Sequence, residues 1–210
     1  MRKHNSLFSL SIAIIVSSLL LSGCTGLKSE AVEKQYFTLS AVRLEKASPP
    51  ENGAALRMHK LRVSPQYRGK ALVYRTGEFS FKSDFYNEFF VPPESQITRN
   101  VREWLKRSGV FRHVVDPKSR VESEYTLEGL VLPLYGDYRD TRNPKAVMGI
   151  EFFLMKEASS LSEITFQKKY YKEIPIKKIS PEELVRGWNR VLEQILKELE
   201  GDLKQVKLDI

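Results

Sequence analysis

Two segments of the chain carry apolar residues at helical spacing, and the first covers residues 93–108. Its apolar positions fall on one face of a helix: Ile97, Val101, Trp104 and Leu105. Pro92 and Pro93 suit the start of a helix, and Gly109 suits the left-handed residue that often ends one. The spacing therefore predicts an amphipathic helix over residues 93–108.

The second helical segment lies at the end of the chain. Ser180, Pro181 and Glu183 fit an N-cap, a first-turn proline and a capping-box acid. An apolar stripe with steps of three and four follows: Leu184, Trp188, Val191, Leu192, Ile195, Leu196, Leu199 and Leu203. The stripe predicts a long helix that packs on the protein's own sheet, because its polar face is mixed in charge.

Most of the remaining chain shows β-forming patterns. Short runs predict strands in "QYFTLSAV", "ALRMHKLRVS", "KALVYRTG", "EFSFKSD" and "VFRHVV". Longer runs predict a meander in "YTLEGLVLPLYGDYRD", "AVMGIEFFLMKE" and "EITFQKKYYKEIPI", with a bend or an edge position at Pro133. These elements predict an α/β (α+β) domain over residues 35–210, with a mostly antiparallel mixed sheet and two main helices packed on it.

The N-terminus has the pattern of an exported protein. Arg2 and Lys3 precede fifteen uncharged, mostly apolar residues from Leu7 to Leu21. This arrangement is typical of a secretory signal peptide, and it is shorter than the roughly 20 residues that span a bilayer. "LSGC" at residues 21–24 resembles a bacterial lipobox, which implies cleavage after residue 23 and acylation of Cys24. An ordinary signal peptide with an incidental cysteine is the alternative.

Cys24 is the only cysteine in the chain, which excludes an intramolecular disulfide. With two or more acyl chains, it would anchor the protein stably. Residues 24–34 then form the acylated cysteine and a polar tether. Thr25 stands where an aspartate would favour retention in the inner membrane, so we expect the protein at the outer membrane, facing the periplasm.

Composition limits the partners. Loss of residues 1–23 leaves 187 of the 210 residues and lowers the formal net charge from +8 to +6, because Arg2 and Lys3 are removed. This surplus suits anionic lipid headgroups or an acidic protein, and equally it suits mere solubility, since the basic residues are spread along the chain. Nucleic acid is excluded as a partner of an exported lipoprotein.

The sequence shows no catalytic, cofactor-binding or metal-binding signature. It contains no Walker loop, no G-x-G-x-x-G, no G-x-S-x-G and no H-E-x-x-H motif. His59 and His113 lie in strand-like runs, where an exposed or hydrogen-bonded histidine is commoner than a ligand. Asp137 and Asp140 suit the turn of a hairpin better than a carboxylate pair. We therefore expect a protein without catalytic activity.

Two stretches are candidates for contact surfaces. "EFSFKSDFYNEFFVPP" holds a dense aromatic run: Phe79, Phe81, Phe85, Tyr86, Phe89 and Phe90. We expect most of these rings in the core and some exposed as a contact surface. The second stretch is "YGDYRDTR", where a partner surface is proposed for Tyr135, Asp137, Tyr138 and Arg139 because tyrosine and arginine carry binding energy at interfaces. A solvated hairpin is the alternative there.

Several of these stretches together resemble a known family. They are the lipobox, "YFTLS", "LRVSPQYRGKALVYR", "DFYNEFFVPPESQITRNVREWLKRSGVFRHV" and the closing helix. In this order they are similar to the ABC-type transport auxiliary lipoprotein family (paraquat-inducible protein C-like). Most members carry a tryptophan before the proline of the aromatic block, where this chain has Phe90 and Val91.

The resemblance implies a lipid-anchored domain at the outer membrane. Such a domain serves a transporter made of an ABC pump and an MCE-domain protein, which moves lipids across the envelope. The sequence is thus interpreted as a docking or capping component, with homo-oligomers left open. The alternative is a chaperone that binds a lipid or another hydrophobic ligand, and an envelope hydrolase ranks last. A closed apolar cavity would favour the chaperone, and an exposed aromatic or charged edge would favour docking.

Overall fold

The computed structural model describes residues 33–158 and 162–208. The expected signal peptide, Cys24 and most of the tether lie outside these residues. Among the helices described, none is both long and apolar enough to cross a membrane.

A nine-stranded mixed sheet is organised around its long strand β7 (Tyr125–Asp137). One edge of β7 pairs antiparallel with β8 (Lys145–Lys156), which in turn pairs antiparallel with β9 (Glu163–Pro175). The other edge of β7 takes three short strands in succession, all parallel to it: β2 (Ala55–Met58), β3 (Arg62–Val63) and β4 (Ala71–Arg75). A 3-10 turn, η2 (Pro65–Tyr67), connects β3 to β4.

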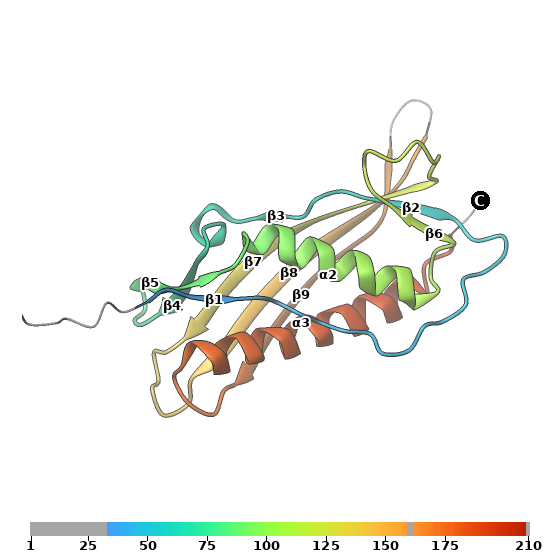
Figure 1. Ribbon diagram of the computed structural model, residues 1–210. Coiled ribbons are helices and arrows are strands. Elements are labelled where there is room, and N and C mark those ends of the chain that lie inside the picture. The colour runs from blue at the N-terminus through green and yellow to red at the C-terminus, as the bar shows by residue number, and fades with distance from the viewer. Residues whose placement is uncertain (1–32, 159–161, 209–210) are drawn as a thin grey trace, which may run out of the picture. The chain divides into compact units, whose positions relative to one another are not determined.

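Three further strands extend the sheet at the two ends of β7. β6 (His113–Val115) pairs parallel with β2, near the start of β7. β5 (Phe81–Phe89) pairs antiparallel with β4, near the end of β7, and β1 (Gln35–Phe37) pairs parallel with β5. Figure 1 shows β1, β4 and β5 gathered at one end of the long strands, with β2 and β6 at the other.

The predicted α+β class is confirmed, and the structure adds the strand directions. The long ladders are antiparallel, as expected, whereas β1, β2, β3, β4 and β6 all make parallel pairs. The bend predicted at Pro133 is present, because the β7–β8 register shifts between Val131 and Leu134. Pro133 lies inside the sheet, where the lack of an N–H donor is accommodated by this irregularity.

Both predicted helices form. α2 spans Pro93–Ser108 and ends at Gly109, whose φ of 72° is left-handed. α3 spans Pro181–Leu203, and the amide of Glu183 donates a 3.3 Å hydrogen bond to the Ser180 side chain, as a capping residue requires.

The apolar stripe of α3 is buried against the sheet, as predicted. α3 packs on β8 and β9, while α2 contacts β3, β6 and α3. Trp188 is fully buried, donates its indole N–H to the carbonyl of Val147 at 3.1 Å, and lies 5.5 Å from the ring of Phe89. These contacts fix α3 on the sheet, and the chain after β1 runs between α2 and α3 (Figure 1).

Candidate interaction surfaces

Most of the residues proposed from sequence as a partner surface are buried. Tyr135, Asp137 and Tyr138 are each more than nine-tenths buried. Arg139 remains partly exposed and holds Asp137 through a 2.6 Å contact between Nη2 and Oδ2. That hydrogen bond comes first among the causes that lower the pKa of Asp137, and burial opposes it. Only Arg139 and the following turn are therefore within reach of a partner, and a contact there stays a prediction.

Tyr138 has a structural setting that its sequence neighbours do not reveal. Its ring stacks on Tyr74 with centroids 5.0 Å apart, and burial raises the pKa of its hydroxyl. The Tyr138 hydroxyl has no hydrogen-bond partner among the described residues, whereas the Tyr74 hydroxyl donates a 2.5 Å bond to Asp84. Sequence reasoning took Tyr138 for a surface residue because turns and interfaces collect the same residue types.

His59 and His113 have solvent-accessible side chains. The side chain of His59 is 44% exposed and lies 3.5 Å from a carboxylate oxygen of Glu128, and His113 is exposed on β6. Within residues 33–158 and 162–208, no three His, Cys, Asp or Glu side chains converge as metal ligands would.

The segment after β1 runs between the two helices, and side chains of both helices hold its backbone. The backbone of this strap (residues 38–47) forms hydrogen bonds with side-chain amides rather than with a neighbouring strand. The Leu39 amide donates a hydrogen bond to Gln96 Oε1 at 2.6 Å, and the Ala41 amide donates one to Asn100 Oδ1 at 2.7 Å. From the opposite helix, Asn189 Oδ1 accepts from the Ser40 amide at 2.9 Å. The strap therefore connects α2 to α3.

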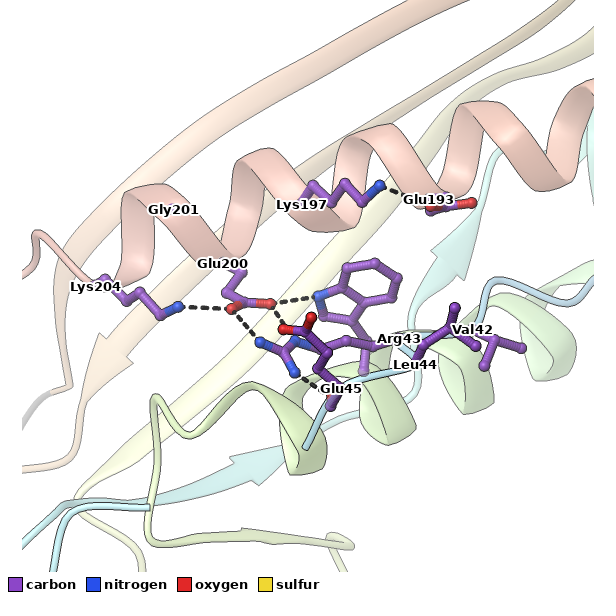
Figure 2. A pocket seen from close by; sticks show the side chains of 10 residues that line it. Val42, Arg43, Leu44, Glu45, Glu193, Lys197, Glu200, Gly201 and Lys204 are labelled. Atoms are coloured by element: carbon purple, nitrogen blue, oxygen red, sulfur yellow. Dashed lines mark hydrogen bonds and ion pairs between the residues drawn. The ribbon is translucent and has the colours of Figure 1, made fainter. Parts of the chain in front are cut away.

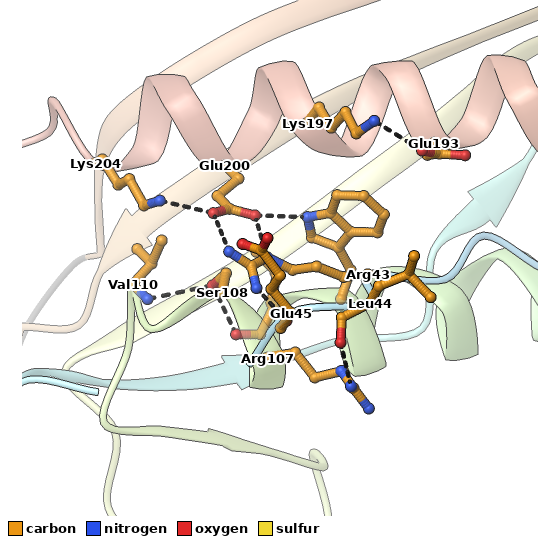
Figure 3. Close-up of polar contacts among 12 residues, drawn as sticks. Arg43, Leu44, Glu45, Arg107, Ser108, Val110, Glu193, Lys197, Glu200 and Lys204 are labelled. Atoms are coloured by element: carbon orange, nitrogen blue, oxygen red, sulfur yellow. Dashed lines mark hydrogen bonds and ion pairs between the residues drawn. The ribbon is translucent and has the colours of Figure 1, made fainter. Parts of the chain in front are cut away.

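Glu200 of α3 is the centre of a polar network beside the strap (Figures 2 and 3). Its carboxylate accepts hydrogen bonds from Arg43 Nε at 2.9 Å, Trp104 Nε1 at 2.9 Å and Lys204 Nζ at 2.7 Å. Burial pushes the pKa of Glu200 upward, but the bonds from Arg43 and Lys204 together outweigh it, so the pKa lies below its ordinary value of 4.5. Glu200 is therefore a paired carboxylate with a structural role, and not a poised acid.

A cleft of about 430 Å³ opens between the strap and α3. This strap cleft has two apolar side chains on the strap, Val42 and Leu44, and Leu44 is 85% exposed. Lys197 on α3 and Lys204 directly after α3 lie across from them (Figure 2), and Lys197 pairs with Glu193 at 2.8 Å. At the end of α2, the Arg107 guanidinium donates a 3.0 Å bond to the carbonyl of Leu44 and so fixes this part of the strap (Figure 3).

The expectation that most aromatic residues of residues 79–90 are buried is wrong. Phe89 is buried, with 1% exposure, and the other five rings are exposed: Phe79, Phe81, Phe85, Tyr86 and Phe90. α3 packs on β8 and β9 and α2 packs on β3 and β6, so most rings of this segment have no helix to pack against. The part of the expectation that some rings are exposed is correct.

Four of the exposed rings lie on β1, on β5 and directly after β5, and we call them the aromatic surface. This aromatic surface consists of Tyr36, Phe85, Tyr86 and Phe90. Tyr36 meets Phe90 edge to face at 6.1 Å, and Phe85 meets Tyr86 edge to face at 5.1 Å. Lys34 places its ammonium group 4.7 Å from the centre of the Phe85 ring.

An irregularity in β5 presents Phe85 and Tyr86. The β4–β5 register shifts between Ala71 and Val73, and Asp84 accepts hydrogen bonds from the amides of Tyr86 at 2.9 Å and Asn87 at 3.0 Å. Burial raises the pKa of Asp84, but these bonds and those from the Tyr74 and Asn87 side chains lower it overall. An ionised Asp84 thus holds the bulge in a fixed shape.

Sequence reasoning missed the strap and Glu200, although the residues of α2 and α3 that hold the strap carry a signal. Glu200 interrupts the apolar stripe of α3 beside Leu199 and four residues after Leu196, a position where a charge needs a buried partner. Gln96 and Asn100 are amides one helical turn apart on the face of α2 that carries Val101 and Trp104. The partner, the strap backbone, is distant in sequence and gives no pattern of its own.

Comparisons with known proteins identify relatives of the fold. No family model matches the chain, and no curated protein matches it. Protein XCC0632 from Xanthomonas campestris, described by the family model DUF330, superposes with a TM-score of 0.67 at 15% identity, over 81% of this chain and 95% of that protein. The chain shares the fold of XCC0632. An uncharacterized protein superposes with a TM-score of 0.60 at 18% identity, over 82% of this chain and 97% of its own length.

These likenesses extend over nearly the whole of both solved chains, and at such low identity they show the fold alone. A subunit of the PelC dodecamer from Paraburkholderia phytofirmans has a TM-score of 0.39 at 10% identity, over 72% of this chain and 92% of the subunit, and no argument rests on it.

Proposed function

We propose that this chain is a non-catalytic lipoprotein of the bacterial envelope, anchored through Cys24 at the outer membrane. It acts as a docking component for a lipid transporter made of an ABC pump and an MCE-domain protein. The proposal joins the export signal and family resemblance in the sequence with a binding surface in the fold.

The observation that carries the proposal is the strap cleft. Leu44 and Val42 expose apolar side chains on a segment whose backbone is fixed by Gln96, Asn100 and Arg107. Exposed apolar side chains on a rigid support, bordered by charged residues, are the features of a protein interface. Because the strap is already held in place, a partner pays little ordering entropy when it binds.

Docking fits the strap cleft better than storage of a lipid. The cleft is open to solvent, and charged side chains from both the strap and α3 line it, among them Arg43, Glu45, Lys197 and Lys204. A site that shields an acyl chain would be enclosed and mostly apolar. An apolar side chain of a partner, flanked by groups that pair with these charges, would fill it.

Copurification from native membranes tests the proposal. The acylated wild-type protein is expected to bring down ABC and MCE-domain components, and the double variant Val42→Asp with Leu44→Asp is expected to lose them. Val121→Asp is the matched control, because Val121 is also an exposed apolar residue, with 47% exposure, in a segment away from the cleft. Thermal unfolding of each variant establishes that it is folded.

Three results would contradict parts of the proposal. Retention of the partners by a folded Val42→Asp, Leu44→Asp variant would remove the strap cleft as the docking site. A wild-type preparation without transporter components, but with lipid bound in a one-to-one ratio, would favour the chaperone. Membrane association of Cys24→Ala equal to that of the wild type would remove the lipid anchor.

A further inference from the structure

We propose that the aromatic surface formed by Tyr36, Phe85, Tyr86 and Phe90 rests on the phospholipid surface of the membrane that holds the anchor. This inference rests on the lipid anchor of the proposed function and adds an orientation to it. The membrane contact gives the domain a fixed side toward the lipid, instead of leaving it free at the end of a tether.

The chemistry of the surface fits the interface between lipid and water. Phe85 is 69% exposed and Phe90 is 61% exposed, so water contacts most of two large apolar rings. Tyr36 and Tyr86 add rings with a polar hydroxyl, the type of side chain that favours the headgroup region. An exposed cluster of this kind is costly in water and marks a contact with a partner or a membrane.

The support beneath Phe85 and Tyr86 is rigid. The Asp84 carboxylate fixes the amides of Tyr86 and Asn87 and is itself held by the Tyr74 hydroxyl. Two adjacent rings are thus projected from a bulge in which the Tyr86 and Asn87 amides are bonded to Asp84. Such a bulge can enter the headgroup layer without leaving unpaired backbone groups in an apolar medium.

The length of the tether selects the membrane as the occupant. Residues 25–34 are the ten that follow Cys24, and the last of them, Lys34, directly precedes β1. They reach at most about 35 Å when extended and much less on average, so the start of β1 stays close to the bilayer. β1 carries Tyr36 and pairs with β5, which places the aromatic surface at the root of the tether.

The charges around the surface agree with this occupant. Lys34 covers the Phe85 ring, and Lys70 and Lys82 are exposed at either side of the bulge on the β4–β5 hairpin. Lysines beside a membrane-contacting surface attract anionic headgroups. The acids within this group are Glu88, which forms a 2.5 Å ion pair with Lys34, and Asp84, which accepts hydrogen bonds inside the bulge.

Fluorescence quenching in vesicles tests the contact. The full-length acylated protein is reconstituted into vesicles of phosphatidylethanolamine and phosphatidylglycerol with brominated acyl chains. The reporter is Phe85→Trp, and the matched control is Ile164→Trp, because Ile164 is an apolar strand residue with 54% exposure. Ile164 pairs with Met155, which lies opposite Thr126. β4 pairs with β7 at Gly136, ten residues after Thr126 along β7, or about 33 Å away at roughly 3.3 Å per residue. The control position therefore lies at the other end of the long strands from β4 and β5.

We expect several-fold stronger quenching of the added tryptophan in Phe85→Trp than in Ile164→Trp, after subtraction of the wild-type signal from the buried Trp104 and Trp188. Bromines near the headgroup end of the acyl chain should quench more than bromines near its methyl end, since interfacial side chains enter only about 5–10 Å. Phe90→Trp is a second reporter on the same surface and should behave like Phe85→Trp.

The possible failures are distinguishable. If the protein binds the vesicles but the tryptophans of Phe85→Trp and Phe90→Trp are not quenched, the membrane contact is overturned and the anchor remains supported. Equal quenching at Ile164→Trp overturns it too, because the domain would then have no fixed side. If the protein self-associates and this shields the tryptophans of Phe85→Trp and Phe90→Trp from the bromines, the aromatic surface binds a second copy of the chain. This result also overturns the membrane contact. Failure of the protein to float with vesicles overturns the anchor together with this inference, whereas missing transporter partners with quenching intact overturns docking alone.

Discussion

The indole N–H of Trp104 on α2 donates a 2.9 Å hydrogen bond to Oε2 of Glu200 on α3. The same oxygen accepts from Nε of Arg43 on the strap at 2.9 Å. One buried carboxylate thus joins both helices and the strap. Its removal would leave the Arg43 guanidinium without its counterion and the Trp104 indole N–H without its acceptor, and the loss of one partner is the costly change in a buried network.

Glu200→Gln should therefore lower the free energy of unfolding by about 3 kcal/mol, because it leaves the positive charge of Arg43 partly buried without a counterion. Denaturant unfolding measures the change. Glu198→Gln is the matched control on the same helix, since Glu198 forms an ion pair with Lys172 but has a 47% exposed side chain. That control should stay within about 0.5 kcal/mol of wild type. Equal stability of both variants would contradict a structural role for Glu200.

Acid should destabilise the protein through carboxylates whose pKa lies lower in the folded state. Burial raises the pKa of Glu200 and Asp202, but their hydrogen bonds, from Arg43 and Lys204 to Glu200 and from Lys168 and Tyr170 to Asp202, lower it overall. Such groups stabilise the fold above their unfolded-state pKa and lose this contribution as pH falls through the folded-state pKa. The free energy of unfolding should therefore decrease as the pH falls below 4.5, the ordinary pKa of glutamate.

The Glu200→Gln variant sharpens this test. Because glutamine does not titrate, the stability difference between variant and wild type should be constant near neutral pH and should shrink as the pH falls below 4.5. Urea unfolding across this pH range measures it. A difference that stays constant down to strongly acid pH would show that the charge of Glu200 contributes nothing.

Two glycines offer a paired test of helix geometry. Gly109 has a φ of 72°, and a Cβ there would lie 2.9 Å from both the Ala47 Cβ and the Ser48 carbonyl oxygen. Gly109→Ala should destabilise the protein by at least about 1–2 kcal/mol, the cost of a left-handed alanine. Gly201 lies inside α3 with no atom near its absent Cβ, so Gly201→Ala should stabilise by about 0.5–1 kcal/mol. Thermal unfolding that ranks the two variants the other way would contradict the geometry at both sites.

The stacked tyrosines should respond in opposite directions to loss of the hydroxyl. Tyr138→Phe removes a buried hydroxyl that has no partner among the described residues, so stability should stay equal or rise by about 1 kcal/mol. Tyr74→Phe removes the bond to Asp84 and should cost about 1.5–3 kcal/mol. Chemical denaturation of both variants compares them. A loss of stability in Tyr138→Phe would reveal a partner for that hydroxyl.

Local patterns in the sequence were sufficient to predict the elements that are stabilised by residues close in sequence. The helix over residues 93–108 and the cap at Ser180 were predicted correctly, because proline, glycine and the capping side chains act within one turn. The three long strands were predicted for a similar reason, since each carries its own β-forming run. Lipidation of Cys24 stays a prediction from sequence.

The contact surfaces depended on which side chains the second layer covers, and this is a property of the assembled fold. An aromatic run of the same composition can be core or surface: Phe89 is buried against Trp188, whereas Phe85, four residues earlier, lies beyond the helices on a bulge. Tyr138 looked exposed and is buried because Tyr74, sixty-four residues earlier, stacks on it.

The sequence by itself determined where helices and long strands form and which face of each is apolar, because those interactions span only a few residues. The tertiary structure alone decided the parallel pairing of β2, β3 and β4 along β7 and the position of the strap between α2 and α3. Both depend on hydrogen bonds between residues far apart in the chain, such as Ser40 with Asn189 and Arg43 with Glu200. No local pattern specifies such partners, since an amide or a carboxylate can pair with many groups until packing brings one of them within reach.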